Sequence, residues 1–261
     1  MTVLDLPDPD TSRLSKAPLA LVVFQVKHEA HAAVSETSVG LALHATMGGV
    51  SGRYPKLEPH HTVGVSFAVG PDGNAQGQQV QATGWRMSSQ DTRWIASIMP
   101  DSFSLETTAY TTWDSDFAER LNELLDAVAE VVSPELVQRI GLRYVNVLTA
   151  SGATTAQDWE TRLAPGVLGL AANPDLGGAV VEHRQQTVFG LDGNISALVM
   201  HGTVVQPGSD EVGYQLDYDI FREGSQPFDT AALKKDAADF NKRCLQIFQT
   251  TLSDEFLATL R

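Results

Sequence analysis

The sequence TVFGLDGNISALV, residues 187–199, decides the fold that we expect for this chain. Its centre, Leu191-Asp192-Gly193-Asn194, has the composition of a tight turn, and strand-forming residues lie on both sides of it. It predicts a β-hairpin with strands at 180–189 and 195–205. A third strand follows at 214–220, where apolar and polar residues alternate strictly, as they do in a strand buried on one face.

A long helix is predicted directly after these three strands. Asp229 has the position of an N-cap, and five apolar residues then recur at helical spacing, namely Leu233, Ala237, Phe240, Cys244 and Ile247. A last short helix is expected over 254–260. Three strands followed by an amphipathic helix form a unit whose sheet packs one face on its own helix.

The first half of the chain shows the same order. Helices are expected at 34–46 and from an N-cap at Asp114 to Val132, and strands at 19–30, 63–69, 80–88, 93–99, 103–111 and 142–148, with a turn at 71–74. We therefore predict an α+β fold of two antiparallel β-meander-plus-long-helix units, a pseudo-duplicated arrangement whose sheets join edge to edge or pack back to back.

Composition changes suggest the limits of these units. Residues 1–17 are polar and contain proline, so we expect a flexible tail. Residues 150–178 are rich in Gly, Ala, Thr and Pro and are expected to be a linker. The first unit then covers 18–149 and the second covers 179–261.

Charge and length restrict the class of partner and the compartment. The 261 residues include 18 basic and 32 acidic side chains, a formal charge of −14, which disfavours nucleic acid and anionic membranes and attracts a basic protein. The start lacks a signal-peptide pattern, and the longest apolar run, 19–24, is too short to span a membrane. With Cys244 as its single cysteine the chain forms no internal disulfide, so we expect a cytoplasmic protein.

The sequence predicts no catalytic residue, no cofactor and no metal site. Both glycine-rich phosphate-loop patterns are absent. His28 and His31 are expected on opposite faces of a strand, and His60-His61 in a loop, so surface histidines are favoured over metal ligands. Cys244 lies on an apolar helix stripe and is interpreted as a buried small hydrophobe.

Several polar and aromatic residues are candidates for contact with a partner or ligand. Each has an alternative interpretation. The carboxylates of Asp217 and Asp219 either bind a cation or a basic partner, or they form a solvated row that prevents edge pairing. The guanidinium and aromatic groups of the other candidates either brace the fold or contact a ligand. The candidates are Asp217, Asp219, Arg143, Tyr144, Asn146, Trp85 and Arg86.

Parts of the chain resemble a sporadically distributed, uncharacterised bacterial protein family. The matching segments are 18–24, 54–56, 84–87, 93–94, 107–113 with Phe117, and 141–146. The resemblance implies no catalytic motif, and the scattered distribution of the family resembles that of mobile, defence or toxin–antitoxin genes. The meander-plus-helix unit also resembles the export chaperone SecB, which holds unfolded chains on antiparallel sheets backed by helices.

Three hypotheses follow from these observations. The favoured one is a non-enzymatic protein-binding module, antitoxin-like or chaperone-like, whose sheet edges accept an additional strand. The second is an enzyme with a cleft between the units, using Arg143, Tyr144 and nearby carboxylates or His60 and His61. The third is a structural component that assembles as a homo-oligomer through its unpaired edges.

Overall fold

A computed structural model describes residues 6–69, 75–205, 208 and 210–261. The turn predicted at 71–74 lies outside these residues. In the described part, nine antiparallel strands form one sheet in the order β2-β3-β4-β5-β1-β6-β9-β8-β7. The strands are β1 (Leu19–His28), β2 (Lys56–Val69), β3 (Ala75–Ser88), β4 (Trp94–Met99), β5 (Ser102–Thr107), β6 (Leu136–Leu148), β7 (Arg184–Gly190), β8 (Ile195–Val205) and β9 (Val212–Pro227).

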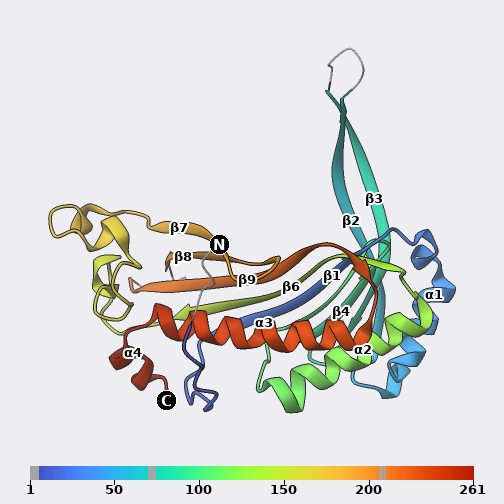
Figure 1. Cartoon of the computed structure of the whole chain (residues 1–261), viewed down its shortest axis with the longest axis horizontal. Coiled ribbons are helices and arrows are strands. Elements are labelled where there is room, and N and C mark those ends of the chain that lie inside the picture. Colours follow the sequence, from blue (N-terminus) through green and yellow to red (C-terminus); the bar gives the residue numbers. More distant parts are fainter. Residues whose placement is uncertain (1–5, 70–74, 206–207, 209) are drawn as a thin grey trace.

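The helices cover one face of the sheet and leave the other face open (Figure 1). The helices are α1 (Thr37–Thr46), α2 (Ala118–Val131), α3 (Thr230–Thr251) and α4 (Asp254–Thr259). The longest, α3, packs on β6 and β9 and against α2. Its beginning is as predicted, because the Asp229 side chain accepts hydrogen bonds from the N–H groups of Ala231 and Ala232.

Strands of both predicted units belong to this one sheet, and the units meet where β6, from the unit predicted at 18–149, pairs with β9, from the unit predicted at 179–261. Strands β1 and β6 pair antiparallel at the middle of the sheet, with Val22 opposite Tyr144. The alternative of two sheets packed back to back is therefore wrong. Strand β6 pairs on its other side with β9, which places Arg143 opposite Asp219.

The core lies between the sheet and the helices. Alternate residues of β1 are fully buried on the helix face, and the apolar stripe of α2 packs against this layer. Cys244 is also fully buried, as predicted for a cysteine on the apolar stripe of α3.

Strands β2 and β3 form an arm that projects from the sheet (Figure 1). The two strands pair along their whole length, from Lys56–Ser88 to Val69–Ala75. Only the part of β3 from Trp85 to Ser88 also pairs with β4. Between residues 75 and 84, β3 thus pairs with β2 alone among the described residues.

Three local predictions were wrong. The helix predicted from Asp114 begins after Thr112 with a π-helical turn, Trp113–Phe117, which lets the rings of Trp113 and Phe117 stack with centroids 5.3 Å apart. The strand expected from residue 180 begins at Arg184, because Gly177–Ala179 forms a 3₁₀ turn. The loop expected to hold His60 and His61 belongs to β2, since Pro59 costs no ladder bond in an edge strand.

Candidate functional site

Two ion pairs brace the open face of the sheet. Arg143 on β6 donates two hydrogen bonds to Asp217 on β9, from Nε to Oδ1 at 2.8 Å and from Nη2 to Oδ2 at 2.6 Å. Such a bidentate pair is among the stronger charge-assisted contacts. Asp217 does not lie in a solvated row, because the guanidinium covers it and leaves its side chain 2% exposed.

The second pair lies beside the first. Arg139 donates to Asp219 at 2.7 Å, and its guanidinium carbon lies 4.8 Å from the centre of the Phe221 ring. Burial raises the pKa of Asp219 above its ordinary value, against the opposing effect of Arg139. Both carboxylates predicted as candidate contacts therefore already have an internal cation.

The remaining candidates are divided between the two faces. Tyr144 and Asn146 lie on the helix face, where the Tyr144 hydroxyl donates to Asn241 Oδ1 at 2.7 Å. Trp85 is also buried, and its indole N–H donates to the Val34 carbonyl at 2.7 Å. Arg86 lies on the open face at 4.0 Å from Glu106. Arg143 and Tyr144 therefore lie on opposite faces of β6.

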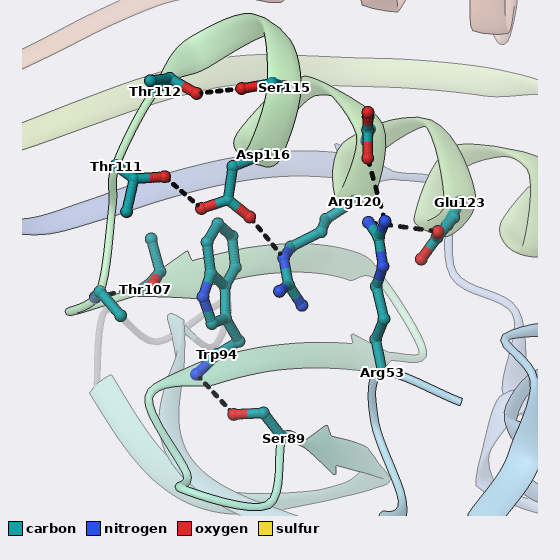
Figure 2. Close-up of polar contacts among 12 residues, drawn as sticks. Arg53, Ser89, Trp94, Thr107, Thr111, Thr112, Ser115, Asp116, Arg120 and Glu123 are labelled. Atoms are coloured by element: carbon teal, nitrogen blue, oxygen red, sulfur yellow. Dashed lines mark hydrogen bonds and ion pairs between the residues drawn. The ribbon is translucent and has the colours of Figure 1, made fainter. Parts of the chain in front are cut away.

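Two of the segments that carry the resemblance, 93–94 and 107–113, contribute Trp94, Thr107, Thr111 and Thr112 to a polar and aromatic cluster, which we call the Arg120 cluster (Figure 2). The Arg120 guanidinium carbon lies 4.2 Å from the centre of the Trp94 ring. Arg120 Nε donates to one oxygen of Asp116 at 2.9 Å, and the Thr111 hydroxyl donates to the other at 2.8 Å. This closed set of contacts fixes the connection from β5 to α2, which is a structural role.

The histidines do not form a metal site in the described part of the chain, where no group of three or more His, Cys, Asp or Glu side chains is arranged to hold an ion. The prediction that His28 and His31 lie on opposite faces was wrong, because β1 ends at His28 and the chain turns. Their ring centroids lie 5.8 Å apart. Burial raises the pKa of the Cys244 thiol well above its usual value, which makes it a poor nucleophile.

Strand β7 is a free edge with exposed apolar side chains. It pairs with β8 on one side, and among the described residues no strand pairs with its other side. Val188 is 61% exposed and Phe189 is 40% exposed. Four additional exposed apolar side chains precede β7 in the sequence or lie at the end of β8, namely Leu170, Leu176, Val181 and Val205. An edge of this kind, without lysine or proline, is open to pairing with another chain.

The hydrogen bonds of β7 show which backbone groups are free. The Thr203 N–H donates to the His183 carbonyl at 3.0 Å. Because bonded and non-bonded pairs alternate in an antiparallel ladder, the N–H and C=O groups of Gln186 and Val188 point away from β8. These N–H and C=O groups can form hydrogen bonds with the backbone of an added strand.

A hollow of about 450 Å³ lies beside this edge, and it is lined by residues of β7, β8 and β9, including Arg184, Gln186, Met200, Gln215 and Asp217. One of these, Asp217, is a candidate from the sequence. The edge itself was missed by sequence reasoning, which predicted the hairpin without its position in the sheet. Strand β7, the hollow and the Arg143–Asp217 pair form the candidate site, which we call the β7 surface.

No protein-family model, curated protein or solved structure matches this chain. Among the described residues, no helix has the length and apolar character that crossing a bilayer requires.

Proposed function

We propose that this chain is a non-enzymatic protein-binding module, antitoxin-like or chaperone-like, that takes an extended segment of another protein as a tenth strand on β7. The observation that supports this most is the free edge of β7, with outward backbone groups at Gln186 and Val188 and exposed apolar side chains. Strand addition obtains affinity from backbone hydrogen bonds and specificity from pockets for alternate side chains. The hollow beside β7 is placed to receive such side chains.

Charge favours a neutral or basic segment as the occupant. Strand β7 contains no acidic residue and one arginine, whereas the whole chain carries a formal charge of −14. A basic partner is attracted by the overall field, and nucleic acid is repelled by it. A cytoplasmic setting in a defence or mobile-element system is part of the same proposal.

The topology supports a duplicated, SecB-like architecture as part of this proposal. Strands β1 and β6 pair with each other, and each also pairs with the last strand of the meander that follows it, β5 and β9 respectively. A helix comes next in both cases, α2 after β5 and α3 after β9. In this arrangement, open antiparallel sheet backed by helices is available for polypeptide binding.

Photo-crosslinking in the native host tests the proposal. A photoactivatable phenylalanine analogue replaces Val188, and the matched control carries it at Val50, which is 78% exposed and distant in the sequence. We expect protein adducts at position 188 and not at position 50. One dominant adduct indicates an antitoxin-like role, and many unrelated adducts indicate a chaperone-like role. The proposal would be contradicted if position 188 gave no more adducts than position 50, both in growing and in stressed cells.

The same edge makes a homo-oligomer the second candidate, because β7 of one copy can pair antiparallel with β7 of another. Mutual repulsion of two chains of charge −14 opposes this pairing. An adduct of the chain with itself at position 188 would favour self-assembly over a different partner. The enzyme alternative is weakened because Arg143 and Tyr144, which it places in one cleft, lie on opposite faces of β6.

A further inference from the structure

The N-terminal residues lie against the helix layer, on the opposite side of the sheet from the candidate site. Residues 6–17, predicted as a flexible tail, run along the second half of α3 towards the end of the chain. The Lys16 N–H donates to the Leu260 carbonyl at 3.0 Å, and the Ser15 hydroxyl donates to the Arg261 carbonyl at 2.7 Å. Leu6 and Leu14 are half-buried against the core, and most of the other residues in the segment are exposed.

Two glutamines of α3 bind this segment through its backbone. Gln249 accepts a hydrogen bond from the Asp10 N–H at 2.9 Å and donates to the Asp10 carbonyl at 2.7 Å. Gln246, which is buried, donates to the carbonyls of Leu6 at 3.1 Å and Pro7 at 2.9 Å. Contacts of this kind recognise an extended chain and place few demands on its side chains.

Two cations add a preference for acidic side chains. Lys242 pairs with Asp8 at 2.6 Å, and Arg261 pairs with Asp10 at 2.7 Å. Within the described ranges, 6–69, 75–205, 208 and 210–261, these are the ion pairs that the two cations form. Both pairs are exposed to solvent, so they hold the segment weakly.

A cavity of about 620 Å³ remains beneath the segment. Its walls come from residues 10–19, from the connection before α2 that the Arg120 cluster fixes, from β6 and from α3, and they include Tyr110, Tyr144, Asn146 and Phe248. The Nδ2 atom of Asn146 is buried and has no hydrogen-bond partner among the described residues. Burial raises the pKa of Tyr110 to about 12 and also raises that of Tyr144, so both phenols are neutral at physiological pH.

We propose that α3 carries a second binding site, for an extended acidic segment of a partner protein, and that residues 6–17 are its internal occupant. We call this site the α3 groove; it consists of Lys242, Gln246, Gln249, Arg261 and the walls of the cavity that β6, α3 and the connection before α2 provide. The internal segment leaves the cavity and the Asn146 amide unfilled. A partner segment with a larger apolar side chain at the position of Leu14, and a carbonyl within reach of Asn146, replaces it.

A peptide competition experiment tests the proposal on the full chain. The probe is a fluorescein-labelled peptide of residues 6–18 that carries Leu14→Phe. In wild type the internal segment competes at an effective concentration of about 1 mM, so the peptide binds weakly. The variant Asp8→Lys/Asp10→Lys loosens that segment, and we expect at least tenfold tighter binding of the peptide, measured by fluorescence anisotropy. Adding Gln246→Ala to this variant should reverse the gain.

The matched control is Glu160→Lys/Asp175→Lys, which reverses two exposed acidic residues that do not line the cavity and should bind the peptide as wild type does. Failure of the peptide to bind the loosened variant, or equal binding after Gln246→Ala, would overturn the proposal. So would light scattering that shows a wild-type dimer abolished by Gln246→Ala, because the occupant would then be a second copy.

Hydrogen exchange of the wild type gives a test that does not depend on the folding of any variant. The amides of Asp10 and Lys16 should exchange at least 100-fold faster than the amide of Val147, which is bonded to the Pro18 carbonyl beside β6. Exchange of Asp10 and Lys16 only at the rate of global unfolding would make residues 6–17 a permanent part of the fold and refute the proposal.

Discussion

Breaking the Arg143–Asp217 pair from either side should give unequal losses of stability. The Asp217 side chain is 2% exposed, whereas that of Arg143 is 43% exposed. Arg143→Met removes the cation and leaves an apolar side chain of similar length over the carboxylate that the guanidinium had covered, and this costs about 3–5 kcal/mol. Asp217→Asn leaves a guanidinium that water can solvate and an amide that still accepts one hydrogen bond, so we expect a loss of about 1–2 kcal/mol.

Urea unfolding followed by tryptophan fluorescence measures both losses, since the chain has four tryptophans. The double variant should lose less than the sum of the two single variants, because the second change removes the group that the first left unpaired. Arg184→Met is the matched control, as this side chain is 79% exposed and should change stability by no more than about 0.5 kcal/mol. A loss for Asp217→Asn equal to or larger than that for Arg143→Met would refute this reasoning.

Three further predictions concern the helix layer and the histidines. Gly40→Ala places a Cβ about 2.2 Å from the Trp85 ring and should lower the free energy of unfolding, measured by chemical denaturation, by about 1–3 kcal/mol. In the control Gly178→Ala the nearest atom to the added Cβ lies at 3.9 Å, so stability should be almost unchanged. Asp229→Ala removes the cap of α3 and should cost about 1 kcal/mol, an effect that an Asp229→Ser variant should largely restore. Burial lowers the pKa of His201 from 6.5 to about 4, so between these pH values the unfolded chain binds more protons than the folded chain. The melting temperature should therefore stay constant above pH 6.5 and fall as the pH drops towards 4. The fall should be less steep in the His201→Gln variant.

The sequence predicted the elements of the second half well because each has a local physical signal. The turn at 191–194 joins β7 to β8 with Gly193 at a positive φ of 55°, and the Asp229 cap begins α3. Alternation correctly placed Tyr214 and Tyr218 on the buried face of β9. In each case the information lies within a few residues, where local backbone preference and burial agree.

The candidate site was harder to predict because it depends on strand order. The sequence of β7 contains no signal of its edge position. That position follows from the strand order, in which β8 pairs with β9 on one side and with β7 on the other. The candidate Asp217 looked solvated because alternation gives the face of a strand, but not the Arg143 side chain that covers that face from another strand. The docking of residues 6–17 depends likewise on Gln246 and Gln249, more than 230 positions away.

Amide exchange of β7 in the complex with a protein captured at position 188 tests the central claim most directly. We predict that the amides of Gln186 and Val188, which point away from β8 in the free chain, become protected when the partner strand is added. Unchanged exchange of these two amides, with protection at another surface, would contradict recognition through the free edge of the sheet.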